Sequence, residues 1–332
     1  MPRGRFFVLT RVGIALARPL LIPYGAAVRT ARRFLRRRDF LHYGSQLVLE
    51  RIESETWSLA WAYIREVDDV VDSTDRETAR NVLREEWVKV RELTEGGELR
   101  EPRLLRDSWL TYFLGNLEKY YDDEEREKVY RVVRELYWSA LLDTARRGKV
   151  LDREEMLRLV RYKAAAFFKL YFTLGRLRME GYEDKIAELL GIALGLLDDF
   201  LDALYDIRTG YVNLTKEELN AFLSEGLTES AKGRGLAILR LLMRARQIAA
   251  KIRNPLARRT VLRLTEAFAA PILEGRFVPG AIYLFKGGRL LLRLLPDDEI
   301  VAYEVGHRII GTLLSVPQLA PTLVKVWVRL TS

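Results

Sequence analysis

The sequence predicts an all-α protein, and three observations support that fold class. Apolar residues recur at three- and four-residue spacing through most of the 332 residues, as in amphipathic helices. No run of alternating residues between turn signals indicates a sheet of any size. Glycine and proline together number only 32, and no stretch is long enough to be a linker between domains. We therefore expect one helical bundle.

The expected helices follow one another along the chain. They cover residues 41–73, 77–95, 104–119, 124–147, 153–180, 183–207, 231–252 and 256–273. Asp152 and Thr215 each precede a basic residue and two glutamates, which is typical of a helix N-terminus. Glycines and paired aspartates mark the breaks, at 95–98, 122–123, 181 and 209–210.

Composition excludes several kinds of functional site. The chain has no cysteine, so disulfides and zinc-thiolate sites are ruled out. Only two histidines are present, His42 and His307, which leaves histidine-based metal sites and catalytic triads poorly supported. The metal chemistry that remains uses oxygen ligands alone, which favours magnesium, with manganese as the second choice.

The net charge of +9 comes from the N-terminal region. Residues 1–38 contain ten arginines and no acidic residue, whereas the rest of the chain has 45 basic and 46 acidic residues, a net charge of −1. A nucleic-acid-binding protein would spread basic residues over its folded surface, so we expect no nucleic-acid partner.

We interpret residues 1–38 as a basic amphipathic arm. Arginines and prolines interrupt its apolar stretch, so it is too short to span a membrane, and it lacks the order of a signal peptide. An organellar transit peptide would be rich in serine, which is absent here. We favour an arm that lies on a membrane surface and meets anionic lipid, in a cytoplasmic, peripherally membrane-associated protein. The alternative is an arm packed on the body, a domain expected over residues 39–296. A C-terminal helical extension, 297–332, would pack on the core or the membrane.

Two aspartate clusters lie 130 residues apart on expected helices. In the first, Asp68 and Asp72 share one helix face with Arg65, and Asp69 lies beside them. In the second, Asp198, Asp202 and Asp206 recur every four residues, a spacing that drifts only ~40° per step around a helix.

The residues between these aspartates are mostly apolar. Because unpaired buried anions are very costly, a carboxylate row in an apolar helix needs compensation. Two rows facing each other across a bundle would hold hard divalent cations, which in turn bind a substrate's phosphates. The alternative is that both clusters are solvated charge runs. Asp199 points about 100° from its row, which favours a bridging role over a direct metal ligand.

These stretches resemble the squalene and phytoene synthase family, the head-to-head isoprenoid synthases. Residues 40–72, FLHYGSQLVLERIESETWSLAWAYIREVDDVVD, are similar to that family's opening signature, which ends in Arg-x-x-Asp-Asp-x-x-Asp. Residues 191–219, GIALGLLDDFLDALYDIRTGYVNLTKEEL, are similar to its second motif. The positions that match there are Gly191, Ala193, Leu194, Asp202, Asp206, Gly210 and Leu214. The resemblance covers about residues 40–275.

The resemblance implies a fold, a reaction and a set of site residues. The fold would be a helical bundle of the isoprenoid synthase type with a central apolar cavity. The reaction would be magnesium-dependent ionisation of allylic C15 or C20 isoprenoid diphosphates and their head-to-head condensation, with release of pyrophosphate. The implied metal ligands are Asp68, Asp69, Asp72, Asp198, Asp202 and Asp206. The residues implied to bind the diphosphate are Arg65, Lys163, Arg208 and Tyr63, and Arg65 would take part in catalysis with the aspartates.

Several positions depart from the family pattern and keep other functions open. Gly195, Asp198 and Leu201 stand where the family has Gln, Asn and Arg, and residues 211, 213 and 215 stand where it has Arg, Tyr and Pro. Asp198-Asp199-Phe200-Leu201-Asp202 is closer to the second motif of head-to-tail polyprenyl diphosphate synthases. A terpene cyclase is a third possibility, and a non-catalytic relative that binds metal or lipid is a fourth. NADPH use and oligomeric state stay open.

Overall fold

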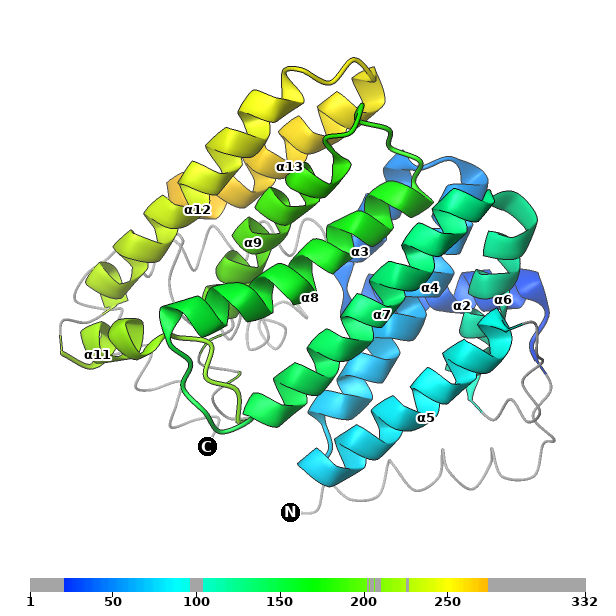
Figure 1. Cartoon of the computed structure of the whole chain (residues 1–332), viewed down its shortest axis with the longest axis horizontal. Coiled ribbons are helices and arrows are strands. Elements are labelled where there is room, and N and C mark those ends of the chain that lie inside the picture. Colours follow the sequence, from blue (N-terminus) through cyan, green and yellow to red (C-terminus); the bar gives the residue numbers. More distant parts are fainter. Residues whose placement is uncertain are drawn as a thin grey trace, which may run out of the picture. The chain divides into compact units, whose positions relative to one another are not determined.

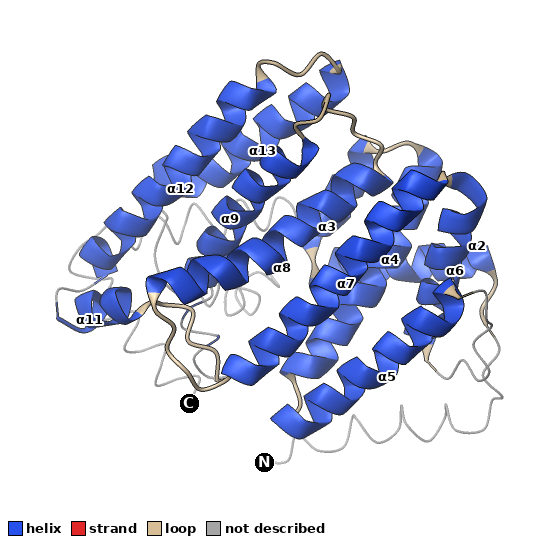
Figure 2. Ribbon diagram, in the orientation of Figure 1, coloured by secondary structure: helices blue, strands red, loops and turns tan. Residues whose placement is uncertain are grey.

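The computed structural model describes residues 21–95, 104–201, 203, 206, 210–224 and 227–273. Within these ranges the ordered elements are helices, and Figure 2 shows no strand. They are α2 (Tyr24–Arg38), α3 (Phe40–Ser45), the 3-10 helix η1 (Gln46–Val48), α4 (Arg51–Asp72), α5 (Arg76–Thr94), α6 (Leu105–Tyr120), α7 (Asp123–Arg146), α8 (Arg153–Leu174), α9 (Glu183–Leu201), α11 (Lys216–Ser224), α12 (Leu227–Ala249) and α13 (Pro255–Leu273). The all-α prediction is confirmed.

The residues group into two compact units. One unit comprises residues 1–131 and 173–176, and the other comprises residues 132–172 and 177–332. The first acidic cluster belongs to the first unit and the second cluster to the second unit. The expected bounds of the arm, of the 39–296 domain and of the C-terminal extension stay predictions, and the extension lies outside the described residues.

The first unit is built around α4, which contacts α2, α5 and α6 (Figure 1). Its N-terminal half is almost wholly buried, with Trp57 and Leu59 fully inaccessible. This half also buries polar side chains, among them Glu53 and Glu55, and the helix is less buried towards its C-terminus, where the aspartates lie. The buried half therefore holds the helix in place while its last two turns present the charged groups.

Helix α2, the last part of the predicted arm, packs on the first unit, which was the alternative interpretation of the arm. Ala27, Ala31 and Leu35 are fully buried, and the helix contacts α4 and α6. Small alanine side chains let it approach these helices closely, so its apolar face is used in packing and is not available to lipid. The arginines on its other face, including Arg29 and Arg33, are exposed. Residues 1–20 lie outside the described residues. No helix that the structure describes is long and apolar enough to cross a membrane.

The second unit is centred on α9, which packs against α12 and α13 (Figure 1). Helix α8 approaches α9 so closely that a Cβ at Gly191 would lie 2.5 Å from the backbone of Ala165. A Cβ at Gly195 would lie 2.5 Å from a methyl group of Val160. The glycine that departs from the family pattern at position 195 is therefore explained by packing.

The predicted helix starts are confirmed, and two predicted helix extents are wrong. Asp152 and Glu155 exchange side-chain-to-backbone hydrogen bonds at 2.9 and 3.0 Å, a capping box, and Thr215 forms the same pattern with Glu218. Helix α8 ends at Leu174 and does not continue to residue 180, since Arg176 has a positive φ of 49°. The predicted helix 41–73 is divided into α3, η1 and α4.

Candidate functional site

Arg65 offsets part of the negative charge of the first acidic cluster, which contains three aspartates. One of its terminal nitrogens lies 2.9 Å from Asp68 Oδ2, and the other lies 2.9 Å from Asp69 Oδ1. Both carboxylates are about a quarter exposed, and Asp72 is half-buried one turn further along α4. The helix thus brings together the four predicted residues of this cluster, and Arg65 forms ion pairs with two of them.

The charge around Arg65 extends to Asp39. Burial alone would lower the pKa of Arg65, but Asp68, Asp69 and Asp39 raise it well above its usual value. Asp39 is itself bound by the His42 ring and by Trp61 Nε1 at 3.0 Å, and its pKa falls to about 2 although burial opposes this. Arg65 Nε is buried and has no hydrogen-bond partner among the described residues, so it keeps donor capacity for a ligand oxygen.

Tyr63 lies one turn before the aspartates, but its hydroxyl is used elsewhere in the described structure. It donates to Glu86 Oε2 at 3.1 Å, and the side chain is almost fully buried. Burial and the neighbouring Glu86 raise the pKa of Tyr63 well above its usual value. Its role in diphosphate binding stays a prediction.

The second acidic cluster begins at the C-terminal end of α9. Asp198 is exposed, whereas Asp199 and Asp206 are half-buried. Asp202 and Arg208, both predicted to belong to the site, lie outside the described residues. The structure therefore places two of the three aspartates in the predicted row.

The described carboxylates of this cluster repel one another. Burial, together with the nearby Asp199 and Asp198, raises the pKa of Asp206 to about 7. Burial likewise raises the pKa of Asp199 to about 6, although Arg146, Arg234 and Lys163 act in the opposite direction. Asp199 lies in the field of three cations, and its predicted bridging role stays a prediction. Whether it binds a metal stays untested.

A polar network that sequence reasoning missed joins Lys163 to Asp206. Lys163 Nζ lies 2.9 Å from Asp143 Oδ2, and Asp143 Oδ1 accepts from Arg146 Nε at 2.5 Å. Arg146 Nη2 donates to Asn213 Oδ1 at 2.7 Å, and Asn213 Nδ2 donates to Asp206 Oδ2 at 2.6 Å. The three-residue spacing of Asp143 and Arg146 on one face of α7 was the sequence signal that could have indicated part of it.

Two guanidinium groups lie against the ring of Tyr211. Arg146 and Arg147 are centred 5.2 and 4.9 Å from it, and Arg147 Nη2 also lies 2.8 Å from the Tyr211 hydroxyl. Tyr211 stands where the resembled family has an arginine. At this place α7 therefore supplies positive charge that the resembled family carries in its second motif.

The donor set fits a divalent cation in its chemistry. All candidate ligands are carboxylates, the oxygen donors that magnesium binds. A bound cation would lower the raised pKa values of Asp199 and Asp206 and favour their charged forms. No group of three or more acidic or histidine side chains close enough to hold one ion is found among the residues described, which do not include Asp202. The metal ligands thus stay predictions.

Four phenylalanines near the second acidic cluster in sequence or on α8 are packed in the core of the second unit. Phe167, Phe168 and Phe172 are at most 6% exposed, and Phe168 meets Phe268 with ring centroids 6.1 Å apart. Phe200 is fully buried beneath the guanidinium of Arg234. Core packing accounts for these positions, and the central apolar cavity stays a prediction.

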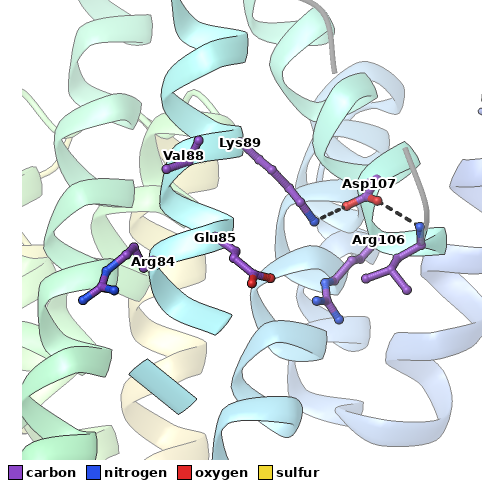
Figure 3. Close-up of a pocket in the computed structure, with 7 residues that line it drawn as sticks. Arg84, Glu85, Val88, Lys89, Arg106 and Asp107 are labelled. Carbon is purple, nitrogen blue, oxygen red and sulfur yellow. Dashed lines mark hydrogen bonds and ion pairs between the residues drawn. The ribbon is translucent and has the colours of Figure 1, made fainter. Parts of the chain in front are cut away.

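A hollow of about 480 Å³ lies on the first unit, between α5 and the start of α6 (Figure 3). Lys89 Nζ crosses it to reach Asp107 Oδ1 at 2.8 Å, and it also lies 2.8 Å from Glu86. Arg106 is paired with Glu86 at 3.0 Å. These two cations are neutralised by carboxylates, and the hollow contains none of the predicted site residues.

Comparisons with known proteins establish the fold. No protein-family model matches the chain, and no curated protein matches it in sequence. The solved squalene synthase HpnC from Alicyclobacillus acidocaldarius aligns with a TM-score of 0.57 and 16% identity, over 78% of this chain and 98% of its own. A dehydrosqualene synthase solved with a ligand aligns with a TM-score of 0.57 and 15% identity, over 81% of this chain and 98% of its own.

The chain therefore has the isoprenoid synthase fold, as the sequence resemblance implied. These structural neighbours support the resemblance to the squalene and phytoene synthase family. At such low identity the likeness extends to the fold and does not by itself assign a reaction.

Proposed function

We propose that this protein is a magnesium-dependent isoprenoid synthase that ionises allylic diphosphates and joins two of them head-to-head. The observation that carries the proposal is the presence of both acidic motifs, each at the end of a long helix, in a chain with the fold of squalene and dehydrosqualene synthases. The substrates would be C15 or C20 isoprenoid diphosphates, and manganese could replace magnesium.

The residues of each motif have distinct tasks in this proposal. Asp68, Asp72, Asp198, Asp202 and Asp206 would hold the metal ions, with Asp69 completing the set. Bound magnesium supplies the electrophile that draws electrons from the breaking carbon–oxygen bond. Arg65 and Lys163 would neutralise the diphosphate as it leaves, and Arg208 would assist them. Lys163 suits this task because its side chain is 47% exposed while Asp143 fixes its position.

The direct test is release of pyrophosphate from farnesyl or geranylgeranyl diphosphate in the presence of magnesium. We expect release from the wild-type protein and its loss in Asp68→Ala and Asp202→Ala. Glu154→Ala is a matched control, since Glu154 is an exposed acidic residue in the first turn of α8. A folded wild-type protein that releases no pyrophosphate from C10 to C20 substrates would rule out the proposal in favour of a non-catalytic relative that binds metal or lipid.

The type of condensation is decided by the product. We favour the head-to-head reaction because both the 40–72 signature and the 191–214 register resemble that family. Head-to-tail elongation is the second candidate, since Asp198-Asp199-Phe200-Leu201-Asp202 resembles the motif of those enzymes, and cyclisation is the third. Product mass spectrometry with and without isopentenyl diphosphate, and with and without NADPH, distinguishes them. A diphosphate-bearing product that requires isopentenyl diphosphate would reject the head-to-head reaction.

We also propose that the protein associates peripherally with anionic membranes. The apolar face of α2 is buried, so the attraction would come from its exposed arginines and from the four arginines within residues 1–20. Each basic residue near an anionic surface contributes about 1 kcal/mol, and salt screens that attraction. Co-sedimentation with anionic vesicles should therefore fall when Arg29 and Arg33 are replaced by glutamine and when salt is raised. Equal sedimentation of variant and wild type would contradict this.

A further inference from the structure

The side-chain amide of Asn213 can take only one orientation in its surroundings. Its Oδ1 lies 2.7 Å from Arg146 Nη2, and a guanidinium can only donate hydrogen bonds. The amide nitrogen must therefore face the other way, where it meets Asp206 Oδ2 at 2.6 Å. The donor of Asn213 is thus directed at an aspartate of the second acidic cluster.

Arg146 is held firmly enough to impose this orientation. Its Nε lies 2.5 Å from Asp143 Oδ1, and its Nη1 lies 3.4 Å from the carbonyl oxygen of Val212. The ring of Tyr211 covers its guanidinium at 5.2 Å. Arg146 and Asn213 are both buried, so water does not compete strongly for these hydrogen bonds.

Asp143 anchors the far end of the network. It pairs with Arg146 on its own helix and with Lys163 on α8, at 2.5 and 2.9 Å. The segment that carries Asn213 is fixed to the end of α7 as well, through the backbone bridge between Val150 and Val212 and the hydrogen bond from Gly148 N to Gly210 O at 2.6 Å. Asn213 is therefore held by both its backbone and its side chain.

We propose that Asn213 is a positioning residue for Asp206, oriented by Arg146 and Asp143. This inference rests on the proposed function, in which Asp206 is a metal ligand. Asn213 binds one carboxylate oxygen and so fixes how Asp206 meets a divalent cation, without touching the cation itself. The resembled family has a tyrosine at position 213, so the arrangement belongs to this chain's own residues.

Metal binding by the full-length protein tests the inference without relying on catalysis. Partners that orient a metal ligand typically change metal affinity by about 10–100-fold when they are removed. We expect Asn213→Ala to weaken Mn²⁺ binding by that factor, measured by electron paramagnetic resonance with and without pyrophosphate. Asn213→Ser, which is too short to join Arg146 to Asp206, carries the same expectation and serves if the alanine variant does not fold.

Asn116 supplies the matched control. It is also a buried asparagine, and it belongs to the first unit. Its amide nitrogen donates to Tyr24 and Thr56, both at 3.1 Å, and neither of these residues belongs to an acidic cluster. Asn116→Ala should lower the melting temperature while Mn²⁺ affinity stays within about twofold, since it removes hydrogen bonds but no support for a ligand.

The outcomes separate this inference from the proposed function. Weakened Mn²⁺ binding in the Asn213 variants alone supports it. If Asp206→Asn weakens binding but the Asn213 variants match the wild type, the positioning role is wrong and the proposed function survives. If Asn116→Ala weakens binding as much as Asn213→Ala, loss of stability explains both and the inference is overturned. A wild-type protein that binds no Mn²⁺ overturns both proposals.

Discussion

The two acidic clusters differ in how their charge is balanced before any metal binds. On α4, Arg65 sits 2.9 Å from both Asp68 and Asp69 and compensates them from within the same helix. In the second unit, cations also lie near the carboxylates, but burial and mutual repulsion prevail and raise the pKa of Asp206 to about 7. The charge of the first cluster is thus partly offset by one arginine, whereas in the second cluster burial and repulsion between carboxylates favour the protonated form of Asp206.

This difference predicts that the two clusters have different roles in the proposed function. A divalent cation that binds the first cluster must compete with Arg65 for two carboxylates. A cation that binds the second cluster relieves repulsion that the folded protein already bears. We therefore expect the second cluster to dominate metal affinity, and Arg65 to be released towards the diphosphate when metal binds.

The largest expected effect is on activity. If both clusters serve one reaction, Asp68→Asn and Asp206→Asn should each reduce pyrophosphate release by at least about 100-fold, the upper end of what loss of a metal-supporting partner causes. The measurement is pyrophosphate release at saturating magnesium, with Glu154→Ala as the control. Normal activity in Asp68→Asn would mean that the α4 cluster does not take part in the chemistry.

The next effect is a pH dependence of stability that belongs to the second unit. A carboxyl group whose pKa is raised on folding holds a proton that the unfolded chain would release, so its contribution to stability falls as pH rises from about 4. For Asp199 and Asp206, with pKa values of about 6 and 7, the fall should extend to about pH 7. Between pH 5 and pH 7.5 the expected loss is at most about 4 kcal/mol, since one pKa unit corresponds to about 1.4 kcal/mol and Asp199 and Asp206 contribute about one and about two units.

Thermal unfolding in EDTA at pH 5 and pH 7.5 measures this effect. Asp39, in the first unit, has a pKa lowered to about 2 and keeps its contribution throughout that range. The double variant Asp199→Asn/Asp206→Asn should therefore reduce the dependence of stability on pH, whereas a variant at Asp39 should not. If the stability of the wild-type protein does not change between these pH values, folding does not raise the pKa values of Asp199 and Asp206.

The packing of α9 gives an effect of similar or smaller size. Gly191→Ala would place a methyl group 2.5 Å from the α8 backbone, and such overpacking typically costs 1–3 kcal/mol, so we expect about that loss of stability. Gly115 on α6 has nothing within 4 Å of an added Cβ, so Gly115→Ala should stabilise the protein by roughly 0.5–1 kcal/mol through helix propensity. Chemical denaturation of both variants checks the contrast. A stabilising Gly191→Ala would mean that α8 and α9 lie further apart than described.

The elements most fully predictable from sequence are those with local signals. The helix starts at Arg153 and Lys216 follow from capping residues three positions apart, and the stripe on α4 follows from helical spacing. The end of α8 was missed although Gly175 follows its last residue directly. Arg176 in the same turn also pairs with Glu53 and Glu125, which are distant in sequence. No local sequence pattern predicts these ion pairs.

The candidate site shows the same limit. Asp68, Asp69, Asp72 and Arg65 are near one another because four residues make about one helical turn. The support of Asp206 comes from Arg146 and Asn213, which lie 67 residues apart. A buried asparagine in a loop carries no sequence signal of the partner that fixes it, so this part of the site required the structure. The resemblance could not supply it either, since the family has a different residue at position 213.

The smallest expected effect is a difference in the direction of the melting-temperature shift between two variants, one in each acidic cluster. In the metal-free protein at pH 7.5, Asp206→Asn should raise the melting temperature, because it removes one of several mutually repelling carboxylates. Asp68→Asn should lower it slightly, by an amount corresponding to about 0.5–1 kcal/mol, because it removes one partner of a partly exposed ion pair with Arg65. Added magnesium should reverse the order, since wild-type protein gains binding energy that Asp206→Asn cannot. If both variants shift the melting temperature in the same direction without metal, the two clusters are balanced alike and the contrast between them fails.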